Sequence, residues 1–389
     1  SAGYLQNWRG RINLLNFQKR GKDLPLPINQ EDRIRAAWQG RISGCMLGKA
    51  VELFSMREGP QALNDYLHAT NSLPLRDYIP YKQELASKHI DQNCCAENLT
   101  YSRPDDDINY TTLALLMLEK FGKALTTADV ARSWMKFLPV ASTYTAERAA
   151  YKTLLSNAHE WFPEGKDPGF DLALCADNVY SDWIGAQIRA DLYGWVCPGN
   201  ADLAVKLATA DAQLSHQGDG VYGAVLVAAL GALIPGFCSA DSASDQPLEQ
   251  ALDQALFYIP EDSECAKAVH FARQLASDPE GTIHIKERYK TLSVVHTVNN
   301  LALVVWALLR HQDDFSAAIG DVVAAGLDTD CNGATVGALW ALQGKPIPAQ
   351  WIQPWQGRVG LSLAGFDQMN IDELVARTIK VAKAMDLNQ

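Results

Sequence analysis

The sequence lacks a continuous apolar stretch that matches a membrane span. Its first residues, SAGYLQNWRGRINLLNFQKRG, carry charge throughout and have no apolar core of the kind that a secretion signal needs. Its apolar runs LVVWALL and VLVAALGALI are shorter than the roughly 20 residues that a spanning helix requires. We therefore expect neither a secreted nor a membrane protein.

Cysteine pairs with the spacing of a zinc site or a redox motif are also missing. The chain has 8 cysteines among 389 residues, and none of them forms a C-x-x-C pair. A chain of this length can bury a core without disulfide bonds. The cysteines therefore indicate ordinary thiols, and we expect a reducing, cytoplasmic compartment.

Positive charge is scarce relative to negative charge. The sequence has 34 Lys and Arg residues against 45 Asp and Glu residues, a formal net charge of -11, and no basic stripe. Binding to nucleic-acid phosphates requires clustered Lys and Arg, so this balance argues against a nucleic-acid partner. An anionic ligand would have to be held by backbone N–H groups, a few local cations or bound metal ions.

Alternating strand-like patterns are almost absent, and TIHIKERY at 282–289 is the single short candidate for a strand. Apolar residues instead recur at three- and four-residue spacing, which predicts helices. The sequence therefore predicts an all-α protein, with helices over 31–54, 109–122, 127–138, 145–157, 201–214, 221–234, 247–258, 264–276, 293–310, 315–325, 332–343 and 371–385.

No Ser- or Gly-rich linker divides the chain into two halves, and no repeat of fixed length is present. Residues 1–30 form an extension before the first strong helical pattern, and 239–247 (SADSASDQP) has the composition of a surface loop. The predicted organisation is an N-terminal extension, 1–30, followed by one catalytic domain, 31–389.

Three adjacent aspartates, Asp105, Asp106 and Asp107, precede an amphipathic helical segment. The simplest interpretation is an N-cap with further acids favoured by the helix dipole. This explains one Asp well and three poorly, because neighbouring carboxylates repel each other. A calcium-binding EF-hand loop does not fit, since Tyr110 and Leu116 stand where that loop requires Gly and Glu.

A second acidic pair, Asp328 and Asp330, flanks Thr329 before a helix rich in small residues. Alone, this pair would also be interpreted as a helix cap. Two such clusters in one acidic helical chain are better explained together, because carboxylates are preferred ligands of hard divalent cations and a cation offsets their repulsion. The two clusters therefore predict a shared metal site.

Two glycine-containing segments need separate treatment. Gly44, Gly48 and Glu52 follow at four-residue spacing, so the glycines allow another helix to approach closely on the face that carries the glutamate. The G-x-G-x-x-G at 218–223 does not indicate a dinucleotide site, because helical residues and not a strand precede it. We expect these glycines to form a turn between helices.

Together these segments resemble the ADP-ribosylglycohydrolase family, which includes dinitrogenase reductase-activating glycohydrolases and J1 crystallins. The resemblance spans roughly 31–385 and preserves the family's order of motifs. It implies a single compact orthogonal helical bundle whose active site holds two divalent cations. Mg²⁺ is the usual ion, and Mn²⁺ or Ca²⁺ are alternatives.

The resemblance also implies roles for individual residues. The implied metal ligands are two acidic pairs, Asp106 with Asp107 and Asp328 with Asp330. Asp105 and Cys331 are also implied as ligands, and each stands where the family has a threonine. The implied catalytic residues are Glu52, the preferred proton-transfer group, and Asp107. The implied contacts to ADP-ribose are Gly185, Ala186, Ile188, Arg189, Asp191 and His216, with Arg189 and backbone N–H groups on the diphosphate.

The sequence departs from the family pattern at several of these positions. Cys331 and Ile108 replace threonines, and Lys49 follows Gly48 where a small or neutral residue is commoner. A thiol is a poor ligand for Mg²⁺, so the number and identity of the cations stay open. A histidine in isolation is more often a structural residue than a ligand, which applies to His216.

The function implied is metal-dependent hydrolysis of a ribosyl glycosidic bond, with removal of ADP-ribose from a modified protein or small molecule. The leaving group, whether arginine, serine, a base or another group, stays open. Two alternatives are hydrolysis of a simpler N-riboside such as a nucleoside, and a catalytically silent ADP-ribose-binding or crystallin-like protein. Retention of Glu52 and all five aspartates argues against the silent alternative.

Overall fold

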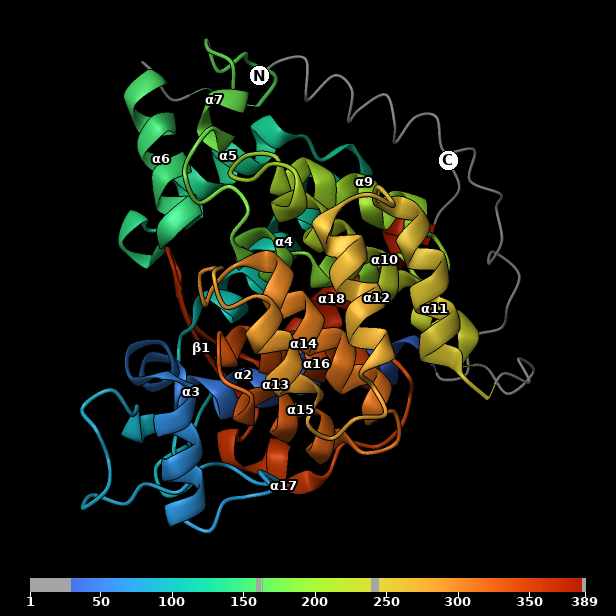
Figure 1. Cartoon of the computed structure of the whole chain (residues 1–389). Coiled ribbons are helices and arrows are strands. Elements are labelled where there is room, and N and C mark those ends of the chain that lie inside the picture. Colours follow the sequence, from blue (N-terminus) through green and yellow to red (C-terminus); the bar gives the residue numbers. More distant parts are fainter. Residues whose placement is uncertain (1–28, 159–161, 163, 239–244, 387–389) are drawn as a thin grey trace.

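A computed structural model describes residues 29–158, 162, 164–238 and 245–386 (Figure 1). The predicted extension, 1–30, lies outside the described residues except for its last two positions, where Asn29 accepts a hydrogen bond from the backbone N–H of Asp32 and caps the first described helix. The predicted loop at 239–247 also lies mostly outside them. The division into an extension and one domain therefore stays a prediction.

The described chain is mainly helical and contains only one two-stranded sheet, which confirms the all-α prediction. Its longer helices are α2 (Gln30–Lys49), α3 (Glu52–Ala69), α4 (Asp106–Phe121), α5 (Thr127–Phe137), α6 (Thr145–Asn157), α9 (Ala201–Ala212), α10 (Asp219–Phe237), α11 (Pro247–Ala255), α12 (Glu264–Gln274), α13 (Gly281–Arg288), α14 (Thr297–Arg310), α15 (Phe315–Ala324), α16 (Thr329–Ala341) and α18 (Ile371–Asp386).

Short helical turns and one hairpin connect these elements. The short α-helices are α7 (Ala173–Ala176), α8 (Asp191–Trp195) and α17 (Ala349–Ile352). The 3₁₀ turns are η1 (Gln92–Cys94), η2 (Gly122–Ala124), η3 (Val140–Ser142), η4 (Ile184–Arg189), η5 (Leu256–Tyr258) and η6 (Gln353–Trp355). The hairpin strands are β1 (Arg358–Leu363) and β2 (Phe366–Asn370).

Helices α2 and α16 lie backbone to backbone along a line of glycines. A Cβ atom added at Gly40, Gly44 or Gly48 would overlap a main-chain carbonyl group of α16, at Gly337, Gly333 and Thr329 respectively. The hydroxyl of Thr329 also donates to the carbonyl oxygen of Gly48 at 2.7 Å. The close helix approach predicted from Gly44 and Gly48 is thus observed, and it brings the end of α2 beside the start of α16.

We expect Gly44→Ala to destabilise the protein although alanine favours helix. The added methyl group would meet the carbonyl of Gly333, and such overpacking typically costs about 1–3 kcal/mol or more. The intrinsic gain of about 1 kcal/mol for alanine in a helix acts in the opposite direction. Urea unfolding monitored by circular dichroism measures the difference, with Ala36→Gly on the same helix reporting the propensity contribution. An unchanged midpoint for Gly44→Ala would contradict the close contact.

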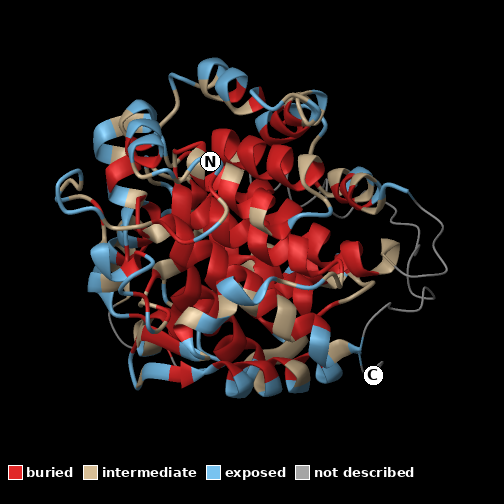
Figure 2. Ribbon diagram, turned by 90° about the horizontal axis from the view of Figure 1, so that it is seen from below, coloured by how far each residue is buried: buried red, intermediate tan, exposed pale blue. Residues whose placement is uncertain are grey.

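Helix α10 runs through the interior and packs against α8, α9, α11 and η4. By length and composition it could cross a membrane, contrary to the sequence-based expectation, but 89% of its apolar window is buried inside the protein. It therefore has the character of a core helix. Figure 2 shows buried residues filling the centre of the helical array and exposed residues around its rim.

The positions of two elements differ from the sequence-based expectations. The single candidate strand, 282–289, is helical instead: residues 282–288 belong to helix α13 (Gly281–Arg288) and Tyr289 is its C-cap, with Ile285 buried and Ile283 56% exposed. Of the G-x-G-x-x-G glycines, only Gly218 precedes α10, at a φ of 52°, whereas the other two lie within the helix. The segment before them is helix α9, which agrees with the rejection of a dinucleotide site.

The hairpin, which sequence analysis does not anticipate, holds the chain just before the first aspartate cluster. Strands β1 and β2 pair antiparallel. The backbone N–H of Ser102 donates to the carbonyl oxygen of Arg358 at 2.8 Å, and the N–H of Gly360 donates to the carbonyl of Ser102 at 2.7 Å. A side chain at Gly360 would collide with Ser102 and Pro104. The hairpin therefore fixes the approach to Asp105.

Candidate functional site

The first aspartate cluster forms the N-terminus of α4. Asp105 is the N-cap, and its Oδ1 accepts a hydrogen bond from the backbone N–H of Asp107 at 2.9 Å. Asp107 is fully buried, and its Oδ2 has no hydrogen-bond donor. Asp106 lies half-buried in the first turn. Capping thus explains the orientation of Asp105 but does not satisfy the carboxylate of Asp107.

The second cluster forms the N-terminus of α16. Asp328 is the N-cap residue, although its side chain caps no backbone group. Its backbone N–H donates to Oδ1 of the buried Asn300 at 3.2 Å, and this same oxygen accepts from Nδ2 of Asn332 at 2.7 Å. Asp330 is fully buried, and neither of its carboxylate oxygens has a hydrogen-bond donor. A helix cap therefore does not account for this cluster either.

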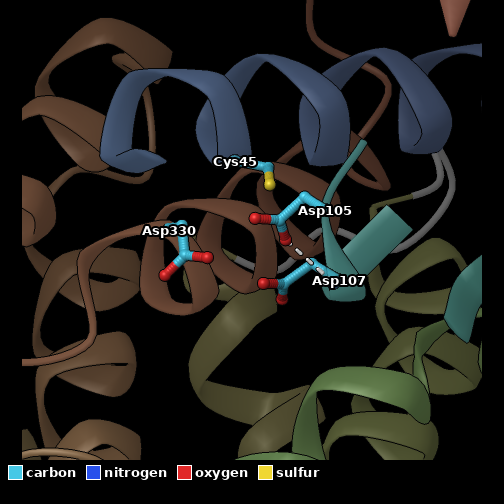
Figure 3. Close-up of side chains that lie close together, drawn as sticks. All are labelled: Cys45, Asp105, Asp107 and Asp330. Carbon is cyan, nitrogen blue, oxygen red and sulfur yellow. Dashed lines mark hydrogen bonds between the residues drawn. The ribbon is translucent and has the colours of Figure 1, made fainter. Parts of the chain in front are cut away.

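The two clusters come from opposite halves of the sequence and meet in one place. Ligand atoms of Cys45, Asp105, Asp107 and Asp330 all lie within 4.8 Å of one another, as do those of Asp328, Asp330 and Cys331. Asp330 belongs to both sets. Figure 3 shows the carboxylates of Asp105, Asp107 and Asp330 and the thiol of Cys45 gathered below α2.

Glu52 lies at the edge of this cluster. It is the first residue of α3, whereas the sequence predicts one continuous helix over 31–54; the preceding helix stops at Lys49, and Val51, with a φ of -123°, separates the two. The Glu52 side chain is half-buried and within hydrogen-bonding reach of Asp330. The break between the helices thus brings a partly exposed carboxyl group to the buried aspartates.

Two buried cysteines complete the cluster, and sequence analysis identifies only Cys331. Burial, with neighbouring aspartates, raises the pKa of both thiols well above the ordinary value. Both side chains therefore stay protonated near neutral pH and are weak ligands for hard cations. Cys45 follows Gly44 on the helix face that meets the aspartates, a position that composition and spacing do not mark.

Burial raises the pKa of most acidic groups in the cluster, because it removes water from the charged form. Burial and neighbouring carboxylates raise the pKa values of Asp106, Asp107 and Asp330 well above the ordinary range. Burial, Asp105 and Asp328 raise the pKa of Glu52 to about 8. Without cations, the cluster therefore holds protons that free carboxylic acids would lose.

These pKa shifts predict that stability depends on pH when cations are absent, and that divalent cations reduce this dependence. A carboxyl group with a raised pKa contributes stability below its ordinary value of about 4, and this is lost as the pH rises toward the folded-state value. Without cations, we expect the melting temperature to fall between about pH 4 and the value near 8 that Glu52 reaches. Saturating Mg²⁺ favours the ionised carboxylates and should flatten this fall. The same fall of melting temperature with pH in chelator and in Mg²⁺ would contradict the prediction.

Arg41 connects the aspartate cluster to the predicted ADP-ribose segment. This buried guanidinium donates to Oδ2 of Asp191 at 3.0 Å and to the carbonyl oxygen of Ile188, and its Nη2 lies 3.4 Å from Oδ1 of Asp107. A further hydrogen bond, from Nε to the hydroxyl of Thr111 at 2.6 Å, joins Arg41 to α4. Arg41 thus fixes Asp107 and the start of α8 relative to each other, a role that sequence analysis misses.

Arg189 and His216 belong to a second buried polar network. The guanidinium of Arg189 lies 2.7 Å from both Glu147 and Asp211 and donates to the hydroxyl of Ser215 at 2.6 Å. Nδ1 of His216 lies 2.7 Å from that hydroxyl, and burial, with Arg189, lowers the pKa of the imidazole well below its usual value. These contacts favour a structural role for Arg189 over the diphosphate contact expected from the sequence.

The remaining predicted ligand-side residues lie along η4 and at the start of α8. Gly185 packs directly against the carboxylate of Glu147, so that a larger side chain would not fit there. Ala186 and Ile188 are buried, and Asp191 is held by Arg41. The structure thus places this segment beside both polar networks. Its contact with a nucleotide stays a prediction.

Comparisons with known proteins agree with this architecture. The sequence profile of the ADP-ribosylglycohydrolase family matches residues 26–385. An uncharacterized protein of Archaeoglobus fulgidus is 24% identical over 185 residues, which are 46% of this chain and 56% of that protein, so the match spans about half of the relative's length. A solved structure described as an ADP-ribosylglycohydrolase-related protein complex shares the fold, with a TM-score of 0.57 and 17% identity over 92% of this chain and 99% of that one.

Proposed function

Since the chain belongs to the ADP-ribosylglycohydrolase family, we propose that it is a divalent-cation-dependent hydrolase that removes ADP-ribose from a modified protein or small molecule. The observation that carries the proposal is the meeting of the two aspartate clusters around Asp330, whose two buried oxygens have no donor. A buried carboxylate without a partner is costly unless a cation compensates it.

The chemistry of the donor set fits a hard cation. Oxygen atoms of Asp107, Asp328 and Asp330 that are buried and lack donors are available as ligands, and carboxylate oxygens are the ligands that Mg²⁺, Mn²⁺ and Ca²⁺ prefer. A bound divalent cation supplies oriented binding of hydroxyl groups and a lowered pKa for water. We propose Mg²⁺ as the physiological ion.

Within this proposal, Glu52 transfers the proton at the glycosidic bond. Its side chain is partly exposed, unlike that of Asp330, so it can meet both a substrate and the buried cluster. Ribosyl hydrolysis passes through an oxocarbenium-like state in which a water molecule loses a proton and the leaving group gains one. A carboxyl group with a raised pKa suits either task.

The neighbouring segment supports the proposed recognition of ADP-ribose. Backbone groups of Gly185 to Asp191 contact the nucleotide in this proposal, and Arg41 positions them through Asp191 and Ile188. Arg189 acts indirectly, by holding Glu147 and Asp211. We also propose a cytoplasmic location, which the 8 free cysteines support.

The experiment that tests this function compares substrates with and without cations. Peptides that carry ADP-ribose on arginine, serine or asparagine, and ADP-ribosylated nucleic acid, are incubated with the protein in Mg²⁺ or in chelator, and free ADP-ribose is quantified. We expect release only with the cation and from one linkage above the others. Hydrolysis of a plain nucleoside at equal rate would favour the N-riboside alternative, and ADP-ribose binding without turnover of any substrate would favour a silent binding protein.

A further inference from the structure

The side chain of Lys49 enters the aspartate cluster from the end of α2. Its Nζ lies 2.8 Å from Oδ2 of Asp105, whose side chain is only 2% exposed. An opposite charge at this distance favours the charged form of a lysine. The ammonium group is therefore charged, and it contacts one carboxylate of the cluster, that of Asp105.

Lys49 and Asp105 are two departures from the family pattern that form one contact. Oδ1 of Asp105 accepts the backbone N–H of Asp107, and Oδ2 accepts the ammonium group. Both oxygens of this carboxylate therefore have donors within the protein. The additional negative charge of Asp105 is matched by the additional positive charge of Lys49.

The remaining charges in the cluster are unevenly compensated. Asp105 is paired with Lys49, and Asp107 lies 3.4 Å from the guanidinium of Arg41. Among the described residues, no basic side chain lies within ion-pair distance of Asp328 or Asp330, and both have buried oxygens without donors. The buried carboxyl groups without a basic partner are therefore concentrated at the start of α16.

Two sets of atoms in the cluster have the spacing for a cation, and Lys49 affects them differently. One set contains Asp105, Asp107 and Asp330, and the other contains Asp328 and Asp330 (Figure 3 shows the first set). A divalent cation in the first set would lie beside Asp105 and meet the repulsion of its ammonium partner in a poorly solvated site, where electrostatic interactions are strong. In the second set, neither Asp328 nor Asp330 forms an ion pair with a basic side chain of the described residues, and both have buried oxygens without donors.

We propose that the ammonium group of Lys49 takes the place of a cation beside Asp105, so that the chain binds one divalent cation, at Asp328 and Asp330. This inference rests on the proposed function, because it assumes that the cluster binds metal ions. It differs from the two-cation arrangement that the family resemblance implies, and it follows from an ion pair that this chain builds into the site.

The test counts bound ions and does not depend on turnover. Mn²⁺ is titrated into the full-length protein, with calorimetry giving the stoichiometry and electron paramagnetic resonance showing whether two ions interact. We expect one ion per chain, with the resolved hyperfine lines of isolated Mn²⁺, for the unmodified protein. Lys49→Met and Lys49→Gln should bind two ions whose spectra are broadened by coupling, because Asp105 then lacks a cationic partner.

Lys49→Arg is the matched control, because it keeps the positive charge and should keep the stoichiometry at one. Lys49→Gln can still donate to Asp105, which preserves a folded protein if Lys49→Met proves unstable. Two coupled ions in the unmodified protein, or one ion in every variant, would overturn the inference and leave the proposed function intact. Absence of Mn²⁺ binding in all of these proteins would instead contradict the metal dependence itself.

Discussion

Asp330→Asn is expected to weaken divalent-cation binding by more than ~10²-fold, since losing even an outer partner of a metal ligand typically weakens binding by about 10- to 100-fold. Asp330 is the residue shared by both sets of ligand atoms, and it is fully buried. Turnover should fall together with cation binding. Isothermal titration with Mn²⁺, followed by initial rates over a range of Mg²⁺ concentrations, measures both effects.

In the absence of cations, Asp330→Asn should stabilise the fold although it weakens cation binding. Without a cation, neither oxygen of the buried Asp330 has a donor, and its raised pKa means that ionisation at alkaline pH costs stability, so the neutral amide should raise the melting temperature in chelator at alkaline pH. The same variant should lose the rise in melting temperature that saturating Mg²⁺ gives the unmodified protein by mass action.

Asp321→Asn is the control for this variant. Asp321 has its own partners, Arg76 at 2.7 Å and His311 at 2.6 Å, and lies outside both sets of ligand atoms. Its replacement should lower stability and leave cation affinity unchanged. An equal loss of cation affinity in both variants would show that destabilisation of the fold, and not removal of a metal ligand, causes the loss.

Glu52→Gln is expected to lower single-turnover hydrolysis by about 10²-fold or more while cation binding stays nearly normal, which is the usual scale for losing general acid–base assistance. The glutamine keeps the shape of the side chain but cannot exchange a proton. The pH dependence of the remaining activity should also lose the limb that belongs to this carboxyl group. Rapid-quench measurement of ADP-ribose release, with Mn²⁺ affinity determined in parallel, separates the chemical step from metal binding.

Glu58→Gln on the same helix provides the comparison. Glu58 is exposed and contacts Ser87 and His89, away from the aspartates. This change should leave the rate within a factor of about two, because surface substitutions away from special features have small effects. A Glu52→Gln protein that hydrolyses at the normal rate would move the proton-transfer role to another group.

The helices and the meeting of the acidic clusters follow from patterns in the sequence, whereas local breaks do not. Three- and four-residue apolar spacing identifies α9, α12 and α18 because each buries one face against the core. It does not show that the first predicted helix ends at Lys49, since Val51 and Glu52 continue the same pattern. That break depends on tertiary packing, and it determines where Glu52 points.

The contacts of charged side chains were the least predictable part of the site. Arg41 and Arg189 look alike in sequence, as single arginines among apolar residues. Arg41 forms ion pairs with Asp107 and Asp191. Arg189 forms them with Glu147 and Asp211, and both arginines are buried. Each pairing joins residues distant in sequence, so it is decided by the assembled fold and not by local spacing. For the same reason, the sequence marks Lys49 and Asp105 as unusual but does not pair them.

The glycine contacts between α2 and α16 also have a consequence for the proposed cation site. An interface filled by side chains can adjust through rotamer changes, but an interface of main-chain atoms has no rotamers to change. Gly48 lies against Thr329, next to Asp330, so this rigid contact reaches the carboxylates themselves. The spacing of the ligand atoms is consequently set when the chain folds, before any ion arrives. An ion of larger radius than this spacing accommodates would have to displace a helix backbone, so we expect the proposed cation site to discriminate between cations by size.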